Sequence, residues 1–162
     1  MPVLPDNPWM GRCTAGVSAI MKTPLLLCLI LTLAACTAPP SRPQRSCFHR
    51  SETIESEIGY CQAVRSGNRL YISGTVGQGE MPAAVQSVYE RLKQTLAASG
   101  LTFRDVVKEN VYTTDLAAFE GSKDIRKAFY GDSLPAATWV QVQRLFLPSL
   151  VVEVELTAEY PK

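Results

Sequence analysis

A segment of 11 largely apolar residues near the N-terminus limits most strongly what this chain can fold into. It runs from Leu25 to Ala35, follows the basic start Met21-Lys22 and ends in small residues before Cys36. This order is typical of a secretory signal peptide. An uncleaved membrane helix is the alternative, but the segment is far shorter than the ~20 residues that span a bilayer. We therefore predict a signal peptide at residues 21–35 and a folded domain only beyond it.

The last residues of this segment, Leu33-Ala34-Ala35-Cys36, are similar to the lipobox of bacterial lipoproteins. The resemblance implies that Cys36 is lipidated, becomes the mature N-terminus and anchors the protein in a membrane of the cell envelope. Several acyl chains on one cysteine would anchor it stably, because a single chain binds membranes only marginally. Thr37, rather than Asp, follows the cysteine, which by analogy indicates the periplasmic face of the outer membrane.

The sequence on either side of this segment carries no folding pattern. Residues 1–20 precede the basic start and include three of the prolines. We interpret them as a start-site miscall, with translation beginning at Met21; a genuine long leader is the alternative. Residues 36–52 contain three more prolines and few apolar side chains, which predicts an extended tether. The folded domain is expected at residues 53–162.

The charge balance excludes one class of partner. The whole chain has 16 basic and 15 acidic residues, and the part from Cys36 onward has equal numbers of both. A neutral domain lacks the basic surface that binds nucleic acid or anionic lipid headgroups. We therefore expect no nucleic-acid partner.

Two cysteines, Cys47 and Cys61, remain after the signal segment and Cys36. In an oxidising compartment they could form a disulfide whose loop of about 15 residues contributes ~3 kcal/mol; two unrelated thiols are the alternative. The cysteine spacing does not match a zinc motif, and His49 is the only histidine. We read His49 as a solvated tether residue and expect neither a metal nor a cofactor.

From Tyr60 onward the pattern predicts an α+β fold. Turn residues Ser66-Gly67-Asn68 separate two β-rich runs, which predicts a hairpin. Apolar residues at helical spacing after Pro82 predict a helix that ends at Ser99-Gly100, and a second helix is expected to reach about Tyr130. The order is ββαβαββ, with two helices on one face of a mixed sheet and strands at 60–65, 69–73, 106–112, 138–145 and 151–158. The other face should be buried against further subunits.

Three segments resemble consecutive blocks of the Rid family (reactive intermediate deaminase, also called YjgF or L-PSP endoribonuclease-like). They read IGYCQAVRSGNRLYISGTVG, DVVKENVYTTDLAAFEG and PAATWVQVQRLFLPSLVVEVELTA, and together they cover about residues 57–159. The resemblance implies a chorismate-mutase-like fold and a homotrimer with clefts between subunits. Active members hydrolyse 2-imino acids, released by pyridoxal-phosphate enzymes, to 2-keto acids and ammonia.

The resemblance also implies where a ligand binds. The family's cleft aromatic matches Tyr60, its Ser-Gly strand end matches Ser73-Gly74, and its glutamate, which places or activates water, matches Glu153. Without the resemblance to the family, Tyr60 would be interpreted as a residue that packs the hairpin. Glu153 and Glu155 share one strand face, so a solvated acidic row is the alternative, and the sequence does not decide which acid faces the cleft.

The chain departs from the family at the residue that holds the substrate carboxylate. The motif Pro-Ala-Arg-Ser/Thr stands here as Pro135-Ala136-Ala137-Thr138, and no other side chain reproduces the planar two-point donor of arginine. Trp139 should reshape the cleft, where the family usually has a smaller residue. Lys123 and Arg144 are candidate replacement cations, although a solvated lysine and a structural arginine are the simpler readings.

We therefore expect a lipid-anchored trimer that binds a small apolar or carbonyl compound without standard imino acid deaminase activity. The alternative is a hydrolase of altered specificity in which Glu153 activates water against an imine or enamine lacking a carboxylate. A ribonuclease is disfavoured by the neutral charge and by the absence of a histidine–lysine site.

Overall fold

The computed structural model describes residues 44–162 of the chain. The predicted signal peptide, the lipidation site Cys36 and the first part of the predicted tether lie outside the described residues. Within residues 44–162, the helices are all too short or too polar to cross a membrane.

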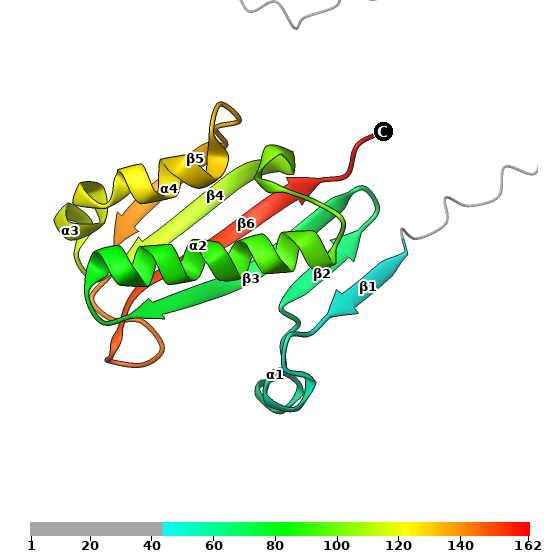
Figure 1. Cartoon of the computed structure of the whole chain (residues 1–162). Helices are drawn as coiled ribbons and strands as arrows, with labels where there is room; N and C mark the ends of the chain where they lie inside the picture. Colours follow the sequence, from blue (N-terminus) through cyan, green and yellow to red (C-terminus); the bar gives the residue numbers. More distant parts are fainter. Residues whose placement is uncertain (1–43) are drawn as a thin grey trace, which may run out of the picture. The chain divides into compact units, whose positions relative to one another are not determined.

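A six-stranded mixed sheet forms the centre of the fold, with strand order β1-β2-β3-β6-β4-β5 (Figure 1). Neighbouring strands are antiparallel except for β4 and β5, which are parallel. The last strand of the chain therefore lies in the middle of the sheet, between β3 and β4. The strands are β1 (Arg45–Phe48), β2 (Ala63–Ser66), β3 (Arg69–Gln78), β4 (Val106–Thr113), β5 (Ala136–Gln141) and β6 (Leu150–Glu159).

Three helices cover one face of this sheet (Figure 1). The longest, α2 (Met81–Ala98), begins with a proline in its first turn and buries an apolar stripe of Val85, Val88, Leu92 and Leu96. The second predicted helix is two helices, α3 (Leu116–Gly121) and α4 (Lys123–Tyr130). They are separated at Ser122, whose hydroxyl donates to the Ala118 carbonyl and competes with the helical pattern.

The sequence before residue 53 is more ordered than a tether, so the predicted tether boundary was wrong. Arg45–Phe48 pairs with β2 as an edge strand, and α1 (Glu52–Ile58) follows it. Cys47 and Cys61 form a disulfide with a Cα–Cα distance of 5.6 Å, which decides between the two alternatives for these cysteines. The bridge joins β1 to the chain just before β2, and this cross-link supports a short strand that has little apolar content of its own.

The strand β6 shows how the two faces of the sheet differ. Val152, Val154 and Leu156 point toward the helices and are buried, whereas the residues between them are only half-buried. This alternation confirms the predicted α+β fold with helices on one face. We call the opposite side the uncovered face.

Candidate functional site

Two carboxylates, Glu153 and Glu155, lie on the uncovered face of the central strand β6. Glu155 is opposite Asn110 of β4, and Glu153 is opposite Tyr112. The Asn110 amide and the Tyr112 hydroxyl both donate to Oε1 of Glu155, at 2.6 and 3.1 Å. Within residues 44–162, Glu153 accepts no comparable hydrogen bond. Both acids therefore share the face, but only Glu155 is held by its neighbours.

Gly74 leaves room for the Glu153 carboxylate. The pairing of β3 with β6 shifts between Ile72 and Thr75, so Ser73 and Gly74 form a bulge. A Cβ atom at Gly74 would overlap Oε1 of Glu153. β-bulges often re-aim side chains beside functional sites, and this one lets Glu153 lie directly over the strand.

The bulge also ties Tyr60 and Cys61 to the same region. The Ser73 hydroxyl donates to the Cys61 carbonyl at 2.7 Å, and its backbone N–H donates to the Gln62 carbonyl at 2.9 Å. Tyr60, the neighbour of Cys61, is partly exposed. The structure therefore brings Ser73 and Gly74 together with Glu153, and it ties the chain next to Tyr60 to the same bulge. The hydroxyl and the backbone N–H of Ser73 both donate hydrogen bonds within the fold, to Cys61 and Gln62.

The surroundings of Glu153 on the uncovered face make its carboxyl a weaker acid than an ordinary glutamate. Burial, and then repulsion from Glu155, raise the pKa of Glu153 above its ordinary value. Burial and Glu155 likewise raise the pKa of Tyr112, which remains a hydroxyl donor. A carboxyl whose pKa moves toward neutrality can both donate and accept a proton, which is the property required of a general acid or base.

Ala137 and Trp139 lie away from these residues within one protomer. Their partners on β4 are Glu109 and Val111, both of which point toward the helices. Trp139 packs edge-on against Phe119, and its indole N–H donates to Glu109 at 3.2 Å. Strand alternation therefore places Ala137 and Trp139 on the side opposite Glu153.

Glu109 is a completely buried carboxylate with four hydrogen-bond donors, and sequence reasoning missed it. Arg126 and Trp139 donate to its Oε1, while the hydroxyls of Tyr89 and Tyr130 donate to its Oε2 at 2.9 and 2.6 Å. Burial, and then Glu109, raise the pKa of both tyrosines, so their hydroxyls remain protonated donors. With every donor engaged, this cluster serves to hold α2, α4 and β5 on β4.

Within residues 44–162, neither replacement cation considered from sequence forms an ion pair with Glu153 or Glu155, and a different cation lies on the uncovered face. Lys123 is exposed at the start of α4, and Arg144 is exposed in the loop before β6. Lys108 of β4 instead shares a face with Asn110, and its ammonium group donates to Oγ1 of Thr138 at 2.6 Å. Two-residue alternation along 108–112 was the signal that could have placed Lys108, Asn110 and Tyr112 together.

Comparisons with known proteins cover nearly all the described residues. The family model described as Endoribonuclease L-PSP matches residues 50–160. A RutC family protein of Pyrococcus horikoshii is 30% identical over 67% of this chain and 93% of its own length. A 2-iminobutanoate/2-iminopropanoate deaminase of Dermatophagoides farinae is 32% identical over 53% of this chain and 74% of its own length. The crystal structure of Rv2704 from Mycobacterium tuberculosis, a YjgF/YER057c/UK114 family member, has a TM-score of 0.67 and 30% identity, and the match covers 72% of this chain and 99% of that one.

Proposed function

We propose that this chain, which belongs to the Endoribonuclease L-PSP family together with the Rid and YjgF proteins, binds a small molecule at Glu153. We also propose that it lacks imino acid deaminase activity. The observation that carries this proposal is the pair of carboxylates on the uncovered face. Glu155 accepts two hydrogen bonds, and Glu153 lies beside it with a raised pKa. A ligand that meets these groups should be neutral or cationic and should donate hydrogen bonds.

A 2-imino acid is a poor match for this surface. Its carboxylate would approach two acidic side chains, and like charges at close range disfavour binding. Ala137 offers no side-chain donor to compensate. Among the strand cations on this face, Arg69 is paired with Glu159, and Lys108 donates to Thr138 and is a point charge without the two-point geometry of arginine.

A complete cleft in this proposal needs a second copy of the chain. Ala137 and Trp139 face away from Glu153 within one protomer, so one site can contain both groups only if they come from different subunits. The uncovered face carries exposed apolar side chains, including Tyr71 at 45% and Val140 at 38% of full exposure. Burying such side chains stabilises association, and we propose that the assembly is a trimer with three shared clefts.

The proposed location is the cell envelope. A lipid on Cys36 would anchor the trimer at the periplasmic side of the outer membrane, away from the pyridoxal-phosphate enzymes that release imino acids. This location agrees with the absence of an arginine at position 137.

The second candidate function is hydrolysis of an imine or enamine without a carboxylate. The observation in its favour is the raised pKa of Glu153, which suits a group that activates water and then protonates a leaving amine. This activity predicts turnover of a neutral imine that disappears in Glu153→Gln, because the amide cannot exchange the proton.

The first experiment separates both candidates from the ordinary family activity. The purified chain is incubated with freshly generated 2-iminopropanoate, and ammonia release is followed with the Dermatophagoides farinae deaminase as the positive control. We expect no acceleration over spontaneous hydrolysis. Acceleration equal to that of the control protein would refute the role assigned to Ala137.

The second experiment tests the charge of the ligand. Small amines, neutral amides and carboxylates are compared by thermal shift with the unmodified chain and with Glu153→Gln. Amines or amides should raise the melting temperature of the unmodified chain and should do so less in the variant. Stabilisation by carboxylates alone would contradict the electrostatic argument.

A further inference from the structure

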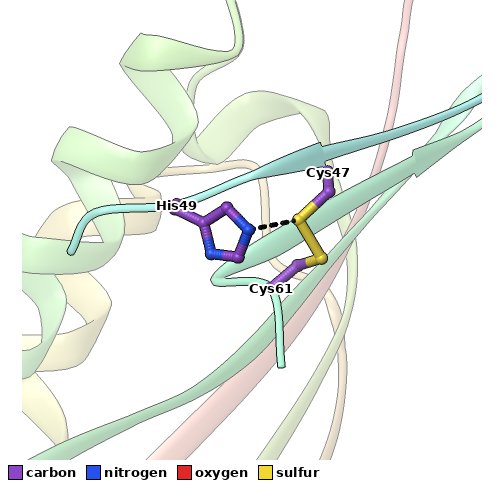
Figure 2. A group of neighbouring side chains, drawn as sticks. All are labelled: Cys47, His49 and Cys61. Atoms are coloured by element: carbon purple, nitrogen blue, oxygen red, sulfur yellow. Dashed lines mark hydrogen bonds between the residues drawn. A yellow bond between two sulfur atoms is a disulfide. The ribbon is translucent and has the colours of Figure 1, made fainter. Parts of the chain in front are cut away.

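The disulfide-linked end of the sheet holds three groups that can bind a metal ion. Cys47 lies on β1, His49 follows that strand, and Cys61 precedes β2, so three separate positions meet here (Figure 2). The ligand atoms Sγ of Cys47, Nε2 of His49 and Sγ of Cys61 all lie within 4.8 Å of one another. We propose that reduction of the Cys47–Cys61 disulfide creates a two-cysteine, one-histidine site for a thiophilic cation such as Zn²⁺.

The hydrogen bond between His49 and Glu55 orients the imidazole for this role. Nδ1 of His49 lies 2.9 Å from Oε2 of Glu55, and Nε2 lies 2.9 Å from Sγ of Cys47. A carboxylate only accepts hydrogen bonds, so Nδ1 donates to Glu55, and Nε2, which faces the sulfur, is the nitrogen left to bind a metal ion. Metal-binding histidines commonly donate their second ring nitrogen to a carboxylate in this way.

Glu55 is itself held in a fixed position. Its side chain is nearly fully buried, and it accepts further hydrogen bonds from the backbone N–H groups of Arg50, Ser51 and Gln62 at 3.1–3.3 Å. Burial opposes ionisation, but the hydrogen bonds from Ser51, His49, Arg50 and Gln62 outweigh it and hold the pKa of Glu55 below its ordinary value. These contacts hold the orienting carboxylate in place beside His49.

The distances need only a small adjustment to suit zinc. Zn–S and Zn–N bonds of about 2.3 and 2.0 Å place tetrahedral ligand atoms roughly 3.5–3.8 Å apart. Breaking the S–S bond lets the sulfurs separate to that range, while the Cα–Cα distance of 5.6 Å already suits two ligands of one ion. Cys47 is exposed and the other two residues are partly exposed, so an ion can enter from solvent.

The chemistry balances with a dithiol as reductant. The dithiol transfers two electrons and two protons to the disulfide and becomes a cyclic disulfide, which leaves two protein thiols. Binding of Zn²⁺ then forms two Zn–S bonds and one Zn–N bond and releases two protons. Three protein ligands leave a fourth position for water or another small ligand. The ion would keep β1 joined to the sheet after the covalent bridge is broken.

The test uses the full chain with Cys13, Cys28 and Cys36 replaced by serine, so that only the two proposed thiols respond. Oxidised and reduced protein are titrated with Co²⁺, which reports thiolate ligation by its charge-transfer absorption, and then with Zn²⁺ against a chromophoric chelator. We expect one ion per reduced chain, two protons released per Zn²⁺, and no thiolate band in oxidised protein. A reduced protein that binds no more metal than the oxidised one would overturn the proposal.

Variants separate this site from two thiols acting alone. His49→Asn should weaken Zn²⁺ binding by at least about 100-fold, and Glu55→Gln should weaken it roughly 10–100-fold, the range for lost orienting carboxylates. Glu57→Gln, an exposed acid on the same helix, is the matched control and should leave the affinity unchanged. Equal affinity in His49→Asn and the parent would refute the assignment of His49. If a variant fails to fold by circular dichroism, the parent titrations still decide.

Discussion

Replacing Glu109 by glutamine should destabilise the protein more than any other exchange of a single carboxylate for an amide. The side chain is 0% exposed and forms an ion pair with Arg126, which is itself only 7% exposed. Removing one partner of a buried pair leaves the other charge uncompensated and typically costs about 3–5 kcal/mol. Glutamine keeps an acceptor oxygen for Arg126 and Trp139, so we expect the lower end, about 3 kcal/mol.

This loss is measurable by urea unfolding at pH 7 without reductant. Trp139 donates to Glu109 and is the only tryptophan of the described residues, so its fluorescence reports directly on the cluster. With an unfolding slope of about 1.5 kcal/mol per molar urea, a loss of that size lowers the midpoint by about 2 M.

Glu155→Gln is the matched control, because Glu155 lies on the uncovered face and accepts two hydrogen bonds rather than four. Its midpoint should fall by less than about 0.7 M at the same slope. Equal midpoints for the Glu109 and Glu155 variants would refute the reasoning that the saturated buried carboxylate holds the helices on the sheet.

Three further predictions concern the other face and the edge of the sheet. Gly74→Ala should lower the free energy of unfolding by less than ~1 kcal/mol, because the new Cβ meets the movable side chain of Glu153. Gly77→Ala should lower it by ~1–3 kcal/mol, because the new Cβ would lie 2.8 Å from the Ala84 carbonyl of α2. Urea midpoints measure both losses, and the reverse order would contradict this reasoning. The raised pKa of Glu153 means that the folded state binds its proton more tightly, so folding stability falls as pH rises above the ordinary value of 4.5. As the pH rises from 4 to 7, the melting temperature of Glu153→Gln should therefore increase relative to that of the parent. If the difference between the two melting temperatures stays constant over this range, the environment does not perturb the pKa of Glu153. Reduction of the disulfide in metal-free buffer should lower the free energy of unfolding by ~3 kcal/mol for a loop of this length. An unchanged urea midpoint would show that the cross-link of β1 contributes nothing to stability.

The main elements were predictable because their signals are local. The helix α2 has helical spacing of apolar residues, a proline at its start and Ser99-Gly100 at its end, and the structure places it within one residue of the expected start. The turn at Ser66-Gly67-Asn68 gave the β2–β3 hairpin for the same reason. The acids of β6 were expected to share a face from strand alternation alone, and they do.

The missed features depend on contacts between distant segments. Arg45–Phe48 has no apolar alternation, and it becomes a strand because β2 and the Cys47–Cys61 bridge hold it. Glu109 looks like a surface residue between Lys108 and Asn110, and its burial follows from donors on α2, α4 and β5 that no local pattern reveals. The contact of His49 with Glu55 likewise requires α1 to fold against the end of β1.

The donors around each carboxylate explain why we propose the site at Glu153 rather than at the more deeply buried Glu109. Glu109 accepts four hydrogen bonds in a closed space, so it has neither a free lone pair nor access to a ligand. Glu155 accepts two and is partly open, which suits a residue that orients its neighbour. Glu153 lies over Gly74 with a raised pKa and, within residues 44–162, with no donor of its own. An unsatisfied, half-buried carboxyl gains most from a ligand that donates a hydrogen bond, since that bond replaces the water it has lost.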